Sequence, residues 1–152
     1  MVSVPELPRY RIGRIRIRLL CAAVVFLLAG VLIYAFFRKS GLLIFHVTGK
    51  IPLWENLPRR YAGRPWGNVL CYNVPGGLWL LSGVLCIRTL WLGPGTRGDV
   101  YVSLFCALAV LLEALQYVRI LPGTFDPADM FVLAATAFGE RLWYTHFIYR
   151  RI

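Results

Sequence analysis

Charged residues are scarce in this chain of 152 residues, where Asp, Glu, Lys and Arg together make up 16%. A soluble domain carries about a quarter of its residues as charges, so the low value excludes an ordinary soluble domain with a hydrated surface. Apolar residues reach 59%, and the mean hydropathy is +0.64. The composition therefore predicts a membrane protein that crosses the bilayer several times.

Motifs of the common enzyme classes are also absent: the chain contains no GxGxxG, Walker loop, HExxH or GxSxG pattern. His46 has no second His, Cys or carboxylate at metal-ligand spacing. The cysteines form no CxxC pair and all fall in apolar segments, which is typical of small core residues; they are Cys21, Cys71, Cys86 and Cys106. We expect no metal, no cofactor and no nucleic-acid partner, and the sequence favours a non-enzymatic protein.

Four apolar segments are long enough to cross a hydrocarbon core of about 30 Å, which takes roughly 20 helical residues. They cover residues 19–37, 69–92, 100–118 and 128–147. The first lacks a small-residue cleavage site, so we interpret it as a retained anchor rather than a signal peptide. In the second, Pro75 either breaks the first turn or begins the helix. We predict one all-α domain over residues 1–152, a four-helix transmembrane bundle with a long interfacial loop after the first helix.

Basic residues near helix ends predict the orientation, because cytoplasmic loops carry an excess of Lys and Arg. Five arginines between positions 9 and 18 favour a cytoplasmic N-terminus, and four crossings return the C-terminus, with Arg150 and Arg151, to the same side. The basic region 38–64 would then lie outside. We interpret it as an interfacial loop or as a contact for anionic headgroups or a phosphate-bearing ligand; its sidedness stays open.

The segment 111–139 places charged and polar residues in an otherwise apolar run. Glu113, Gln116 and Arg119 are spaced i, i+3, i+6, which predicts that they follow one side of the third helix near its outer end. A carboxylate inside a membrane span costs a few kcal/mol and therefore raises a functional-site hypothesis. Asn73 of the second helix is predicted to lie at a similar depth.

A helix-start pattern follows, with Asp126 expected at the N-cap, Pro127 at the first position and Asp129 near the positive end of the helix dipole. Asp129 is either a second charge of that kind or part of a site. Glu140 and Arg88 either pair across the bundle or reach water separately.

These residues resemble the signature of VanZ-like membrane proteins, in which an ExxQ pair ends one helix, a Pro/Gly hairpin follows, and an Asp opens the last helix ahead of a Gly. The resemblance covers about 30 residues and depends on Glu113, Gln116, Pro122, Gly123, Phe125, Asp126, Asp129 and Gly139. Thr124 stands where the family usually has Arg, and Arg119 is a candidate replacement for that guanidinium. The early Asp, Lys, His motif and the Asn of the last helix have no counterpart here.

The resemblance implies a cell-envelope protein, since the family is associated with low-level resistance to the glycopeptide antibiotic teicoplanin. We hypothesise a bacterial inner-membrane protein whose outer-leaflet polar groove binds a lipid-linked envelope precursor or a lipoglycopeptide among the membrane lipids. The expected ligand-binding residues are Asn73, Glu113, Gln116, Arg119 and Asp129.

Two alternatives belong to other functional classes. The first is an intramembrane hydrolase or transferase that uses Glu113 or Asp129 as general base and Arg119 as an electrophilic clamp. The second is a structural subunit that packs small-residue faces against protein partners in the membrane; the candidate faces are Gly76, Gly77 and Gly83, or Ala134, Ala135 and Gly139.

Overall fold

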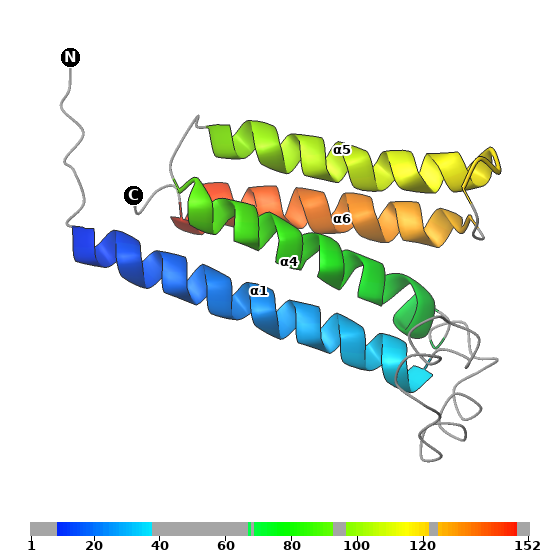
Figure 1. Cartoon of the computed structure of the whole chain (residues 1–152), viewed down its shortest axis with the longest axis horizontal. Coiled ribbons are helices and arrows are strands. Elements are labelled where there is room, and N and C mark those ends of the chain that lie inside the picture. Colours follow the sequence, from blue (N-terminus) through cyan, green and yellow to red (C-terminus); the bar gives the residue numbers. More distant parts are fainter. Residues whose placement is uncertain (1–8, 38–66, 68, 93–96, 122–124, 149–152) are drawn as a thin grey trace.

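The computed structural model describes residues 9–37, 67, 69–92, 97–121 and 125–148. Within these ranges the chain is helical and contains no strand, so the prediction of an all-α fold is confirmed. Long helices run roughly along one common axis (Figure 1). They are α1 (Arg9–Phe37), α4 (Val74–Leu90), α5 (Arg97–Tyr117) and α6 (Pro127–Trp143).

Single turns of π-helix extend two of these helices. The turn η3 (Val69–Asn73) leads directly into α4, and η4 (Tyr144–Ile148) continues α6. Pro75 lies in the first turn of α4, where a helix leaves its backbone N–H groups unbonded and therefore tolerates proline. The α1 helix begins at Arg9, ten residues before the apolar span predicted from residue 19, because arginines continue a helix without adding hydropathy.

The helix α4 occupies the centre of the bundle and packs against α1 on one side and against α5 and α6 on the other (Figure 1). Two small groups of buried apolar residues hold these contacts. Leu80 and Val84 of α4 pack with Val102 of α5 and Leu133 of α6. On the opposite side of α4, the buried residues are Leu19, Ala23 and Leu85.

Glycines bring neighbouring helices into close contact with α4. A Cβ on Gly77 would lie 2.7 Å from Val132 Cγ1 and 2.8 Å from Thr136 Oγ1, and a Cβ on Gly83 would lie 2.5 Å from the Phe105 ring. Gly77 and Gly83 therefore pack within the chain, so their predicted availability to a protein partner is wrong. The other predicted face remains open, since Ala134, Ala135 and Gly139 are exposed.

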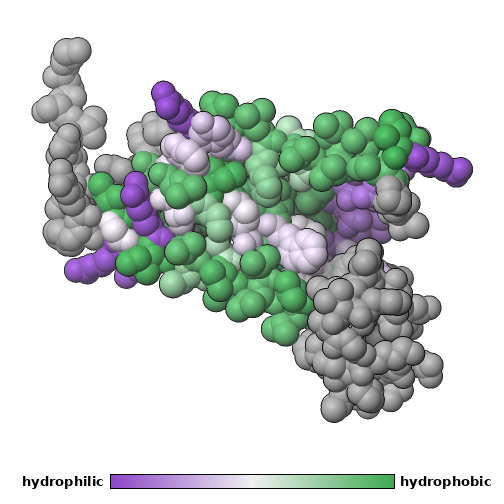
Figure 2. All heavy atoms as spheres, in the orientation of Figure 1, coloured by the Kyte–Doolittle hydropathy of each residue, from purple (hydrophilic) through white to green (hydrophobic). Residues whose placement is uncertain are grey.

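The outer surface of the helices is apolar. Figure 2 shows hydrophobic side chains along the middle of the bundle and hydrophilic ones near both of its ends. Phe131 is 75% exposed, and many other large apolar side chains face outward. Soluble monomers rarely expose such continuous apolar surface, so this surface agrees with a membrane environment.

Among the residues that the structure describes, three helices are long and apolar enough to cross a membrane: Arg11–Ile33, Val69–Leu90 and Arg97–Tyr117. The α6 helix has 17 residues and contains Asp129, Glu140 and Arg141, and it is not among them. Membrane crossing by this fourth helix stays a prediction. The basic region 38–64, the hairpin residues 122–124 and the C-terminal arginines lie outside the described residues.

Candidate functional site

Asn73 joins the beginning of α4 to the beginning of α6. It ends η3, is only 2% exposed, and its side-chain amide donates two hydrogen bonds to carboxylates. Asn73 Nδ2 lies 3.1 Å from Asp126 Oδ2 and 2.9 Å from Asp129 Oδ1. Three of the residues selected from the sequence therefore meet in space although more than fifty positions separate Asn73 from the two aspartates.

Asp126 occupies the N-cap position of α6, as its place before Pro127 predicts. Its backbone is extended, with φ −126°, and its Oδ1 accepts the Ala128 N–H at 2.9 Å. The hydrogen bond from Asn73 and the one from the Ala128 backbone both stabilise the charged carboxylate, so they lower the pKa of Asp126 below its ordinary value. Asp129 lies in the first helical turn, where the helix dipole favours a negative charge, and also binds Asn73.

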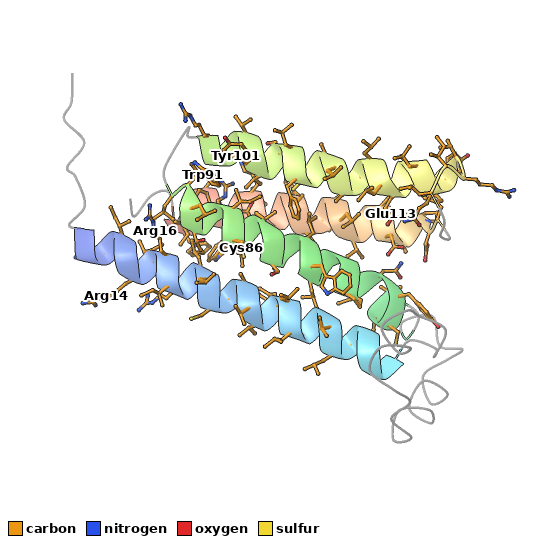
Figure 3. The ribbon with its side chains drawn as sticks, in the orientation of Figure 1. Arg14, Arg16, Cys86, Trp91, Tyr101 and Glu113 are labelled. Atoms are coloured by element: carbon orange, nitrogen blue, oxygen red, sulfur yellow. The ribbon has the colours of Figure 1, made fainter. Side chains whose placement is uncertain are left out.

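Glu113 lies near the C-terminal end of α5 (Figure 3), within electrostatic range of Asp126 and Asp129. Its side-chain oxygen Oε2 is buried and has no hydrogen-bond partner among the described residues. A buried carboxyl oxygen without a partner costs about 1 to 3 kcal/mol or more, and both burial and the charges of Asp126 and Asp129 disfavour a charge on Glu113. We call Asn73, Glu113, Asp126 and Asp129 the acidic cluster; within the described residues no cation joins it.

Gln116 and Arg119 have different relations to the acidic cluster. Gln116 is half-buried one turn after Glu113 on the same side of α5. The α5 helix ends at Tyr117, and Arg119 adopts φ 60°, a left-handed conformation that glycine usually takes after a helix. Arg119 is exposed. The prediction that Arg119 continues the helical line of Glu113 and Gln116 is therefore wrong.

The hydrogen bonds of this helix end explain the conformation of Arg119. The Ile120 N–H donates to the Leu115 carbonyl at 2.9 Å, and the Arg119 N–H donates to the Gln116 carbonyl at 3.0 Å. This pair of bonds is the Schellman motif, which satisfies carbonyls that a helix end leaves open. Arg119 thus has a local structural role, and in the described structure it does not supply a guanidinium to the carboxylates.

A second polar group lies at the other end of the same helices. Arg88 is fully buried, and its Nε lies 3.0 Å from Glu140 Oε1 while its Nη1 lies 2.6 Å from Asp99 Oδ1. Asp99 also pairs with Arg141, whose side chain is half-exposed. The Arg88 guanidinium lies 3.8 Å from the centre of the Tyr144 ring. We call Arg88, Asp99, Glu140 and Arg141 the buried ion network.

The buried ion network decides between the two sequence-based interpretations of Arg88 and Glu140, because the two side chains pair directly across the bundle. Sequence reasoning missed Asp99 completely. Its position could have indicated the pairing. Asp99 lies in the first turn of α5, and only a short loop separates that helix from the end of α4 that carries Arg88, so the two residues are expected at a similar depth. Opposite charges at one depth in neighbouring helices are candidates for pairing.

Among the described residues, no three His, Cys, Asp or Glu side chains are arranged to hold a metal ion. Comparisons of the chain with protein-family models, with curated proteins and with solved structures found no match. The functional argument therefore depends on the two polar groups themselves.

Proposed function

We propose that this chain is a multi-pass protein of the bacterial inner membrane that binds the polar head of an amphiphile at the acidic cluster and does not catalyse a reaction. In this proposal α6 forms the fourth span, both termini are cytoplasmic, and the acidic cluster lies toward the outer leaflet. The ligand is a lipid-linked envelope precursor or a lipoglycopeptide. The VanZ-like resemblance of Glu113, Gln116, Asp126 and Asp129 is the source of the envelope assignment.

The observation that carries this proposal is the unsatisfied carboxyl group of Glu113. Its Oε2 is buried without a described hydrogen-bond partner, within electrostatic range of Asp126 and Asp129. Asn73 already donates to both aspartates. A buried acceptor in this position gains stabilisation from a donor that arrives with a ligand, because a hydrogen bond to a charged group contributes about 1.5 to 3 kcal/mol.

The charge of the acidic cluster restricts which part of an amphiphile it can contact. Three carboxylates repel a phosphate or diphosphate and attract an ammonium, an amide N–H or a sugar hydroxyl. For a lipid-linked disaccharide-peptide, the contacting part is therefore the sugar and peptide head with its free amine. For a lipoglycopeptide, the corresponding groups are its amine and its sugar hydroxyls.

A binding measurement on the full-length protein in lipid nanodiscs tests the proposal, with a lipid-linked disaccharide-pentapeptide that carries a free side-chain amine and with teicoplanin as probes. The double variant Glu113→Ala/Gln116→Ala removes the unpaired carboxylate and its polar neighbour. We expect its Kd for at least one probe to rise at least tenfold, since a lost charged hydrogen bond corresponds to roughly 10-fold to 150-fold.

Arg119→Ala is the matched control, because Arg119 is polar, near in sequence and exposed. Its Kd should equal that of the unmodified chain. Acetylation of the probe's amine should weaken binding to the unmodified chain and have little further effect on the double variant. Unchanged binding in a double variant that retains its helical circular dichroism would refute the proposal.

A further inference from the structure

The first part of α1 extends beyond the apolar part of that helix. The helix contains 29 residues, which at 1.5 Å per residue gives a length of about 43 Å. The hydrocarbon core is about 30 Å thick, and residues 19–37, which carry no charge, are about as long as that core. The excess is the arginine-bearing segment 9–18, which therefore reaches the level of the lipid headgroups.

Arg11, Arg14 and Arg18 lie on one side of this segment, because their spacing is i, i+3, i+7. All three are exposed. Figure 3 shows Arg14 pointing away from the other helices, whereas Arg16 lies on the side of α1 toward them. We call Arg11, Arg14 and Arg18 the arginine stripe.

An aromatic pair lies at the same end of the bundle as the arginine stripe. Trp91 follows α4 and Tyr101 belongs to the first turns of α5, with ring centroids 4.6 Å apart. Trp and Tyr rings concentrate at the headgroup level of membrane proteins. Figure 3 shows Arg14 farther along the bundle axis than this pair, toward the N-terminal end of α1. The stripe thus lies at or just outside the hydrocarbon boundary.

Exposed apolar side chains continue the arginine stripe along α1. Val25 lies seven residues after Arg18 and is 61% exposed, and Leu32 lies seven residues further on and is 52% exposed. A spacing of seven residues keeps side chains on the same face of a helix. A molecule bound along this face therefore meets guanidinium groups at one end and a run of apolar side chains below them.

We propose that the arginine stripe binds the headgroup of an anionic phospholipid whose acyl chains lie along Val25 and Leu32. A guanidinium group matches a phosphate with two parallel hydrogen bonds. The exposed Val25 and Leu32 below the stripe favour a lipid as the ligand, because a soluble phosphate compound has no acyl chains to pack against them.

The test is a titration of the delipidated full-length protein with phosphatidylglycerol or phosphatidylcholine, with bound lipid counted by native mass spectrometry. Each basic residue near a membrane surface contributes roughly fivefold to the attraction of anionic lipid. The triple variant Arg11→Gln/Arg14→Gln/Arg18→Gln should therefore bind phosphatidylglycerol at least tenfold more weakly. Its affinity for phosphatidylcholine, which has the phosphate but no net charge, should fall much less.

Three further measurements decide the interpretation. The triple lysine variant should retain most of the affinity, since it keeps the charge, and Arg119→Gln at the other end of the bundle should retain all of it. Glycerophosphoglycerol, which has the headgroup without acyl chains, should not compete at millimolar concentration. Equal affinity of the glutamine triple variant and the unmodified chain, an equal loss in Arg119→Gln, or full competition by glycerophosphoglycerol would each overturn the proposal.

Discussion

The acidic cluster and the buried ion network lie at opposite ends of the same three helices and differ in charge balance. The buried ion network contains Arg88 and Arg141 together with Asp99 and Glu140, so its charges cancel. The acidic cluster combines carboxylates with a single amide. Each charge in the buried ion network is paired with an opposite charge of the same chain, so the folded structure alone accounts for its burial. The buried carboxyl oxygen of Glu113 has no partner among the described residues, so it has no such explanation there and supports the proposed binding role.

The largest effect should come from breaking the balanced group. Arg88→Leu leaves Glu140 buried without its counter-ion, and removal of one partner of a buried ion pair costs about 3 to 5 kcal/mol. We expect a loss of that size in the free energy of unfolding, measured by denaturant titration in mixed micelles. The double variant Arg88→Leu/Glu140→Leu should recover most of the loss, because Asp99 keeps its pair with Arg141. If the double variant were less stable than Arg88→Leu, the unpaired charge of Glu140 would not be the cause of the stability loss.

Removal of a carboxylate from the acidic cluster should not lower the free energy of unfolding. Glu113→Gln keeps the size of the side chain and removes the repulsion from Asp126 and Asp129. The free energy of unfolding should therefore stay constant or rise, under the same conditions in which Arg88→Leu loses stability. A loss of more than about 2 kcal/mol in Glu113→Gln would mean that this carboxylate has a structural partner and would weaken the functional assignment.

Arg119→Gly should raise the free energy of unfolding by about 1 kcal/mol, since a left-handed backbone conformation costs a residue with a Cβ roughly that amount. Arg119→Ala keeps the Cβ and should bring no such gain, which makes it the matched control. Probe affinity should be the same in both variants. Weaker binding in both would mean that Arg119 contributes to the binding site and supplies the cation that the acidic cluster lacks among the described residues.

The smallest effect concerns the pH dependence of the cap at Asp126. The pKa of Asp126 is lowered in the folded chain, so its charged form stabilises the fold above the unfolded pKa of about 3.9, and this contribution is lost as the pH falls through the folded pKa. Thermal unfolding between pH 7 and pH 3 should show this loss. Asp126→Asn keeps a capping oxygen but does not titrate, so its curve should be flatter than that of the unmodified chain. Identical curves would argue against the Asn73 and Ala128 bonds as the cause.

Much of the fold could be predicted from the sequence because apolar runs of about 20 residues determine membrane-length helices. The spans at 69–92 and 100–118 agree with Val69–Leu90 and Arg97–Tyr117 to within three residues. Hydropathy does not reveal the start of α1 at Arg9, since the preceding arginines favour a helix without being apolar. The span predicted at 128–147 corresponds to the helix α6, but α6 is not among the helices that are apolar and long enough to cross a membrane. Its charges lower its hydropathy, although two of them pair with neighbours on other helices.

The candidate site could be predicted in part. Asn73 and Asp129, both expected in the groove, meet, and Asp126, expected only as a helix cap, joins them. Depth does not specify which way a side chain faces, so the pairing of Arg88 with Glu140 could be stated only as one alternative. The spacing of Arg119 predicts a helical side chain only if the helix continues. The early end of α5 depends on backbone bonds that an arginine at this position does not signal.

The most direct test of the central claim measures stability and binding together in two variants. Glu113→Gln should retain its free energy of unfolding and lose affinity for the amine-bearing lipid-linked disaccharide-pentapeptide at least tenfold. Arg88→Leu/Glu140→Leu should bind that probe as the unmodified chain does. The reverse result, with normal binding by Glu113→Gln and lost binding by a folded Arg88→Leu/Glu140→Leu variant, would contradict the assignment of function to the acidic cluster.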